Sequence, residues 1–183
     1  MQKKIFLAIL LLILSSFFWS GNFFIGKLAS NNELSPFKLS FFRWLLAFLI
    51  LLPFTIKEII SNLSIFKRDI KLIILLSFLG VTVFNSFTYI SLHTSLLINS
   101  SLMASIAPVL IIGFSWIIFQ TKTTYLQFMG IFLSLFGVFC IVLKGNIFNL
   151  LQLNFILGDI WMFIAVFSWG LYSVLLKKID SSI

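Results

Sequence analysis

Several polar side chains lie inside long apolar stretches of this sequence, where a polar group must find a partner. They are Asn22, Arg43, Asn85, Tyr89 and Asn99. Amides and a guanidinium can bind a small polar molecule through directed hydrogen bonds, but each costs free energy in apolar surroundings when it stays unpaired. We therefore expect the amides and the phenol to face one another or a water-filled cavity, as contacts between helices or as cavity lining.

Arg43 is the one basic residue that lies clearly away from the ends of its apolar stretch. An arginine at the centre of a bilayer costs roughly 2.5–3.5 kcal/mol on insertion scales. Arg43 lies about six residues from the outer end of its stretch, which is roughly 9 Å deep in a helix. Two interpretations stay open: the side chain snorkels outward or caps carbonyls, or it attracts an anionic or zwitterionic substrate.

Helical spacing groups these residues with nearby aromatic side chains. Asn85 and Tyr89 are four residues apart and share a helix face, as do Trp19 and Asn22 at a spacing of three. Trp169 and Tyr172 repeat the spacing of three. The candidate substrate-cavity residues are Trp19, Asn22, Arg43, Asn85, Tyr89, Asn99, Trp169 and Tyr172.

The composition requires lipid around most of the chain. Apolar residues make up 61% of the 183 residues and charged residues 10%, whereas soluble domains have about 45–50% and about 25%. A helix needs about 20 apolar residues to cross a bilayer core. The sequence predicts an all-α, polytopic transmembrane helix bundle of about six spans, at residues 5–26, 37–56, 72–92, 96–119, 124–143 and 158–176.

Basic residues set the predicted orientation. With a cytoplasmic N-terminus, nine Lys and Arg residues lie on the cytoplasmic side and three on the outer side, which agrees with the positive-inside rule. The net charge of +8 sits singly or in small groups between apolar stretches. The expected surroundings are therefore a lipid bilayer, and no nucleic-acid partner is expected.

Small residues and one proline indicate helix packing. Gly130, Ser134 and Gly137 share a helix face, and small residues let helix backbones approach closely in lipid. A helix contact is favoured there over a substrate contact. Pro108 removes a backbone hydrogen bond to the Ala104 carbonyl, so it should kink span 96–119. That kink is either a packing bend or part of a cavity.

The sequence offers no chemistry for catalysis. All five acids lie in predicted loops or at helix ends, and the chain contains no metal-ligand cluster, no His/Cys/Asp catalytic set and no phosphate loop. We expect no enzyme activity, cofactor or metal. A proton-coupled antiporter of cationic drugs needs a carboxylate within the membrane, so that interpretation loses weight as well.

An internal repeat links the first and sixth spans. Trp19 and Lys27 are eight residues apart in FFWSGNFFIGKLA, and Trp169 and Lys177 are eight apart in FSWGLYSVLLKKI. The offset between the copies is 150 residues. A repeating unit of five spans is odd, so its second copy would enter the membrane inverted, as in many transporters.

The chain resembles the EamA-type branch of the drug/metabolite transporter superfamily over nearly its whole length. The matching stretches are FFWSGNFFIGKLA, LSPFKLSFFRWLLAFLILLPF, TYISLHTSLLINSSLMASIAPVL, LQFMGIFLSLFGVFCIVL and GDIWMFIAVFSWGLYSVLLKK. The resemblance implies a five-helix repeat at 1–146 and the truncated start of a second repeat at 147–183. The family often has a glutamate where this chain has Thr121, so no role of that acid carries over.

This resemblance implies a membrane transporter that moves small polar metabolites across a plasma membrane by alternating access. The expected membrane is the inner membrane of a bacterium. The alternative is a truncated or non-transporting membrane subunit that pairs with another copy or with a second half-transporter. In either case the face of span 158–176 that should pack on its own repeat has no partner within the chain. We therefore expect this span to be the least well-packed helix.

Overall fold

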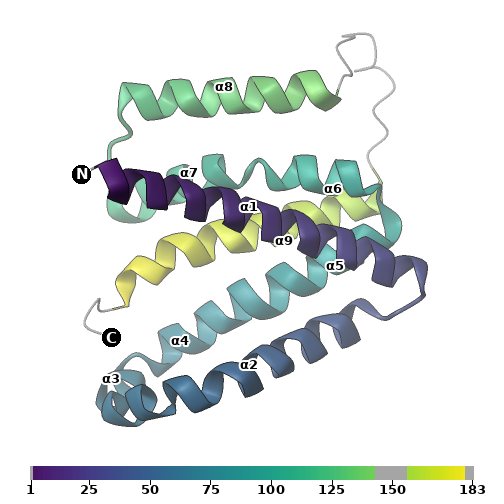
Figure 1. Ribbon diagram of the computed structural model, residues 1–183. Helices are drawn as coiled ribbons and strands as arrows, with labels where there is room; N and C mark the ends of the chain where they lie inside the picture. The colour runs from purple at the N-terminus through teal and green to yellow at the C-terminus, as the bar shows by residue number, and fades with distance from the viewer. Residues whose placement is uncertain (1, 143–155, 180–183) are drawn as a thin grey trace.

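The computed structural model describes residues 2–142 and 156–179, and every element assigned in them is helical (Figure 1). The predicted all-α class is therefore confirmed for these residues. The elements are α1 (Gln2–Asn31), α2 (Pro36–Ser61), α3 (Leu63–Arg68), α4 (Ile70–Ser77), η1 (Phe78–Val83), α5 (Phe84–Thr94), α6 (Leu97–Ala104), α7 (Ala107–Phe119), α8 (Tyr125–Val142), α9 (Leu157–Leu175) and η3 (Leu176–Lys178).

Five helical segments are long and apolar enough to cross a membrane. Their bounds are Ile5–Asn31, Pro36–Ser61, Ile70–Thr94, Leu97–Phe119 and Leu157–Lys178. They correspond to five of the six predicted spans. The remaining prediction, 124–143, coincides with α8, in which the apolar stretch Tyr125–Gly137 is shorter than the other five.

The third span contains one turn of π-helix between α4 and α5. In η1 the backbone N–H of Phe84 donates to the carbonyl of Leu79, five residues earlier, instead of four. A π-turn accommodates one extra residue and leaves nearby carbonyls available to other donors. Ser168 of α9 also binds at this turn, because its hydroxyl donates a second hydrogen bond to the Leu79 carbonyl at 2.7 Å.

The fourth span is interrupted where Pro108 occurs. α6 ends at Ala104 and α7 begins at Ala107, so Pro108 lies in the first turn of the second piece. A proline is tolerated there because the first N–H groups of a helix have no partner within it. The predicted kink is thus a break between two helices.

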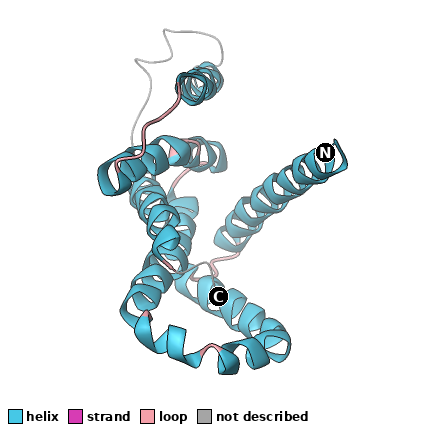
Figure 2. Ribbon diagram, turned by 90° about the vertical axis from the view of Figure 1, so that its left-hand side faces the viewer, coloured by secondary structure: helices cyan, strands magenta, loops and turns pink. Residues whose placement is uncertain are grey.

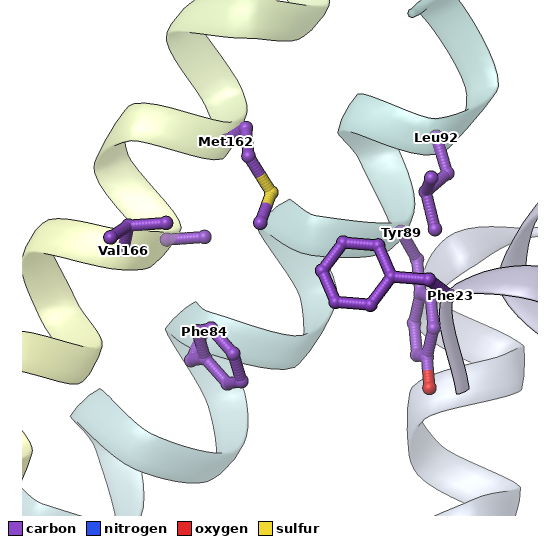
Figure 3. Packing of buried hydrophobic residues seen from close by; sticks show 7 residues of the cluster. Phe23, Phe84, Tyr89, Leu92, Met162 and Val166 are labelled. Atoms are coloured by element: carbon purple, nitrogen blue, oxygen red, sulfur yellow. The ribbon is translucent and has the colours of Figure 1, made fainter. Parts of the chain in front are cut away.

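The core lies where α9 crosses α5, and the expectation that this last span packs poorly is wrong. α9 packs against α5, α6 and α7. Met162 and Val166 of α9 belong to the same buried cluster as Phe84 and Leu92 of α5, with Leu92 on the side of α5 that faces α1 (Figure 3). Small residues of α9 let the two helices approach closely, and Ala165 among them is fully buried. α9 therefore packs against helices of the first predicted repeat.

α1 and α8 are the loosely packed helices. The N-terminal half of α1 diverges from the other helices, and its side chains at 5–20 are all exposed (Figure 2). α8 lies apart from the rest (Figure 1). Gly130 and Gly137 have no described atom within 4 Å of an added Cβ, so the predicted packing face is without a neighbour in this part of the chain.

The predicted orientation can be tested at α3. Ser64 is exposed on this helix between the second and third spans. A Ser64→Cys variant, made in a Cys140→Ser background, is expected to resist a membrane-impermeant maleimide in intact cells, because the positive-inside rule places α3 in the cytoplasm. Asn32→Cys, directly after the C-terminal end of α1 and on the predicted outer side, should react with the maleimide. Labelling of Ser64→Cys before permeabilisation would invert the topology.

Candidate functional site

Arg43 of α2 ties three helices together through its guanidinium. Its Nη1 donates hydrogen bonds to Asn22 Oδ1 of α1 and to the Tyr89 hydroxyl of α5, the latter at 2.6 Å. Its Nη2 donates to Asn85 Oδ1 of α5. The Tyr89 hydroxyl in turn donates to Asn22 Oδ1 at 2.8 Å. These four residues, the Arg43 cluster, form one closed hydrogen-bonded network.

The π-turn positions Asn85 for this network. Its amide nitrogen donates to the carbonyls of Gly80 and Val81, at 3.1 and 3.0 Å, inside η1. With the nitrogen held by those carbonyls, the amide oxygen is directed toward Arg43. Asn85 therefore satisfies a local backbone irregularity and a guanidinium at once, and it is 3% exposed.

Aromatic rings form a wall of the same cavity that the Arg43 cluster lines. The Trp19 and Trp169 rings meet edge to face at 5.5 Å between centroids, and Phe84 lies 4.6 Å from Trp169. The Tyr172 ring covers Gly80, where an added Cβ would come within 2.6 Å of it. Rings and polar groups enclose a partly open cavity of about 290 Å³, which is lined by Phe18, Trp19, Asn22, Arg43, Trp44, Gly80, Val81, Phe84, Asn85, Trp169 and Tyr172.

A second cavity of about 220 Å³ adjoins the first and shares Trp19, Phe84 and Trp169 with it. Its far side is lined by Ala104 and Ala107, the residues that flank the break in the fourth span. The helix interruption at Pro108 therefore lies beside a cavity.

The structure brings seven of the eight predicted cavity residues together and leaves one aside. Six line the larger cavity, and Tyr89 joins them through Arg43 and Asn22. Asn99 of α6 lines neither cavity and shares no hydrogen bond with the cluster. Arg43 caps no carbonyl within the described chain, because its partners there are side chains.

A second polar group, which the sequence did not reveal, joins α1, α5 and α9 at one end of the bundle. The Lys27 ammonium donates to the carbonyls of Leu92 and Ser95, at 2.7 and 2.9 Å, at the C-terminus of α5. The Ser95 hydroxyl donates to Asp159 Oδ1 at 2.7 Å, and Asp159 Oδ2 accepts from the Ile156 N–H. We call Lys27, Ser95 and Asp159 the end clamp.

The end clamp uses the charges of helix ends. A cation is favourable at a helix C-terminus, and a carboxylate at an N-terminus, because of the unpaired backbone groups there. Lys27 and Asp159 occupy these positions on α5 and α9. In the sequence, Lys27 is one of the three outer basic residues and Asp159 is one of the five acids in loops or at helix ends. Their position next to a helix end was the only available signal.

Removing the Lys27 charge should loosen this end of the bundle. Lys27→Met is expected to lower the free energy of unfolding by about 1–2 kcal/mol, because two carbonyls lose a charged donor. The measurement is unfolding by dodecyl sulfate in mixed micelles. Lys38→Met removes an exposed charge on α2 and should change the value by less than about 0.5 kcal/mol. Equal effects in the two variants would contradict the role of the clamp.

α1 and α9 run antiparallel across the site. Trp19 meets Trp169 near their middle, while the C-terminal part of α1 and the N-terminus of α9 meet at the end clamp. Figure 1 shows the same relation, with the N-terminus of α1 and the C-terminus of α9 at one side. The two tryptophans that match in the internal repeat are thus neighbours in opposite-running helices.

Helices of this length and apolarity, with polar groups gathered inside, define a multi-pass membrane protein of the helical type. Comparison with known families narrows the class. Residues 6–143 match the EamA-like transporter family, so the chain belongs to this family. No solved structure matches the chain significantly.

The chain is also similar to several longer proteins. It is 30% identical over 170 residues to an uncharacterized transporter of Archaeoglobus fulgidus, covering 92% of this chain and 57% of the relative. It is 29% identical over 130 residues to the uncharacterized transporter YyaM of Bacillus subtilis, covering 71% and 42%. A WAT1-related protein of Arabidopsis thaliana is 30% identical over 136 residues, covering 69% and 37%. The chain thus spans about half the length of the curated relatives it matches.

Proposed function

We propose that the chain is part of a transporter that moves small polar metabolites across a plasma membrane by alternating access. The observation that carries the proposal is the Arg43 cluster at the edge of a cavity among α1, α2, α5 and α9. A charge held within the membrane span is costly unless it serves a pathway or finds partners. Relatives named as transporters in an archaeon and a bacterium support transport as the function. The place we propose for it is a bacterial inner membrane.

An inverted second repeat fits this geometry. Residues related by a pseudo-two-fold axis touch each other only near that axis, and Trp19 and Trp169 are both equivalent in the repeat and 5.5 Å apart. The cavity beside them would then lie at the interface of the two repeats, where transporters bind their substrates. We infer that residues 1–146 act as one five-helix repeat and that 147–183 begin a second. Another copy or a second half would supply the remaining helices.

Release from loaded vesicles tests the transport activity. Liposomes that contain the purified chain are loaded with an isotopically labelled extract of small metabolites, and the released compounds are identified by mass spectrometry. A subset should leave faster than from empty liposomes. Gly130→Ala, on α8 away from both cavities, should behave as the unmodified chain does. If no compound leaves faster, the chain does not transport by itself, and a non-transporting subunit becomes the better interpretation.

A further inference from the structure

We infer that the larger cavity binds a small organic monoanion: a carboxylate carried on a flat, apolar body. Arg43 would bind the carboxylate, and the aromatic wall would cover the body. The inference deepens the proposed function and rests on it only for the statement that the bound molecule is also transported.

Within residues 2–142 and 156–179, no acidic side chain neutralises the charge of Arg43. All three of its partners are neutral oxygens, and the only salt bridge in the described residues joins Arg68 to Asp69, elsewhere in the chain. A guanidinium within a span is stabilised most by an anion at short range, since Coulomb energies are large where water is scarce. One positive charge without a counter-ion selects a ligand with one negative charge.

The Arg43 guanidinium is held in a fixed orientation, and some of its N–H donors are not used by the described chain. It has five N–H groups, of which the described chain engages three. No buried side-chain nitrogen in the described residues lacks a partner, so Nε, which has none there, is accessible. The Trp44 and Tyr89 rings lie 5.5 Å from the guanidinium carbon and further fix its position. An arginine held in this way can present two parallel N–H groups to a carboxylate.

The other walls of the cavity favour a flat apolar body. Six of the eleven lining residues are aromatic: Phe18, Trp19, Trp44, Phe84, Trp169 and Tyr172. Rings prefer stacked or edge-to-face contacts with other flat groups. The volume of about 290 Å³ is at the small end of ligand sites, which are roughly 300–1,000 Å³. The ligand is accordingly smaller than most drug-like molecules.

Three probes that share a phenylpropyl skeleton and differ in charge test the inference. They are 3-phenylpropanoate, its neutral amide 3-phenylpropanamide, and the cation 3-phenylpropylamine. Binding to the full chain in detergent is followed by tryptophan fluorescence, because three of the five tryptophans line the cavity. The anion should bind about tenfold or more tightly than the other two, as expected for charge-assisted hydrogen bonds. Equal binding of the three probes, or no binding of the anion, would overturn the inference.

Two substitutions and one control locate the preference at Arg43. Arg43→Gln should abolish the tenfold preference, while Lys38→Gln, which removes an exposed charge from the same helix, should leave it intact. Asn22→Asp keeps the shape of the amide but places a carboxylate against the guanidinium. It should also abolish the preference, even where Arg43→Gln fails to fold. An anion preference that survives in Asn22→Asp would show that Arg43 is not the binding group.

The result of the binding experiment does not depend on whether the chain transports. If the anion binds selectively but no compound leaves the loaded vesicles faster, the binding inference stands and the transport proposal fails. If vesicles release neutral or cationic metabolites while the anion probe does not bind, the transport proposal stands and this inference fails.

Discussion

Asn85→Leu is expected to lower the free energy of unfolding by about 2–4 kcal/mol and to abolish ligand binding in the larger cavity. The leucine removes the acceptor that binds Arg43 Nη2 and the donor that binds the carbonyls of Gly80 and Val81. A buried group left without its partner costs about 1–3 kcal/mol, and more when it is charged. Unfolding in mixed micelles and fluorescence titration with 3-phenylpropanoate measure the two effects.

Asn99→Leu is the matched control, because it makes the same chemical change outside the network. Asn99 lines neither cavity and shares no hydrogen bond with the Arg43 cluster, so we expect a change in the free energy of unfolding of less than about 0.5 kcal/mol. Comparable losses in the two variants would mean that any asparagine in a span matters equally, and the special position of Asn85 would be refuted.

Gly158→Ala should lower the free energy of unfolding more than the addition of a methyl group at any other position of α9. Its Cβ would lie 2.8 Å from Ser95 Cβ and 2.9 Å from the Ser95 backbone nitrogen. Because the backbone cannot rotate away, the start of α9 must shift and the Ser95–Asp159 hydrogen bond of the end clamp must lengthen. Overpacking of this kind costs typically 1–3 kcal/mol, and we expect about 3 kcal/mol from mixed-micelle unfolding.

Gly130→Ala provides the comparison, since no described atom lies within 4 Å of its added Cβ. Alanine is the better helix former by roughly 0.5–1 kcal/mol, so this variant should be neutral or slightly more stable. A large loss at Gly130 would instead indicate that the small-residue face of α8 has a partner, as the sequence predicts.

Much of the candidate site could be predicted from the sequence, because lipid cannot satisfy polar groups. Asn22, Asn85 and Tyr89 had to find partners, and the structure supplies them together with Arg43. The rotation of each helix about its axis could not be predicted with the same certainty. Asn99 obeys the same physical rule, yet it lines neither cavity.

The packing of α9 shows where the sequence reasoning failed. We expected this helix to lack a partner because its own repeat would have to supply one. Helix packing in lipid depends on shape, since apolar faces gain little by avoiding lipid. Gly158, Ala165 and Gly170 give α9 a surface that α5 and α7 fit closely. Counting the spans of each repeat could not predict a packing partner that is determined by the shape of the helix surfaces.

The single π-turn in the third span makes the spacing of the chain itself part of the site. Deleting one residue between Phe78 and Val83 would restore a regular helix, and every later side chain would turn by about 100° relative to α4. Asn85 and Tyr89 would then leave Arg43, although no residue of the cluster had changed. In an alignment of relatives, a one-residue gap here should mark proteins that have lost this way of holding the arginine, even where all four side chains are retained.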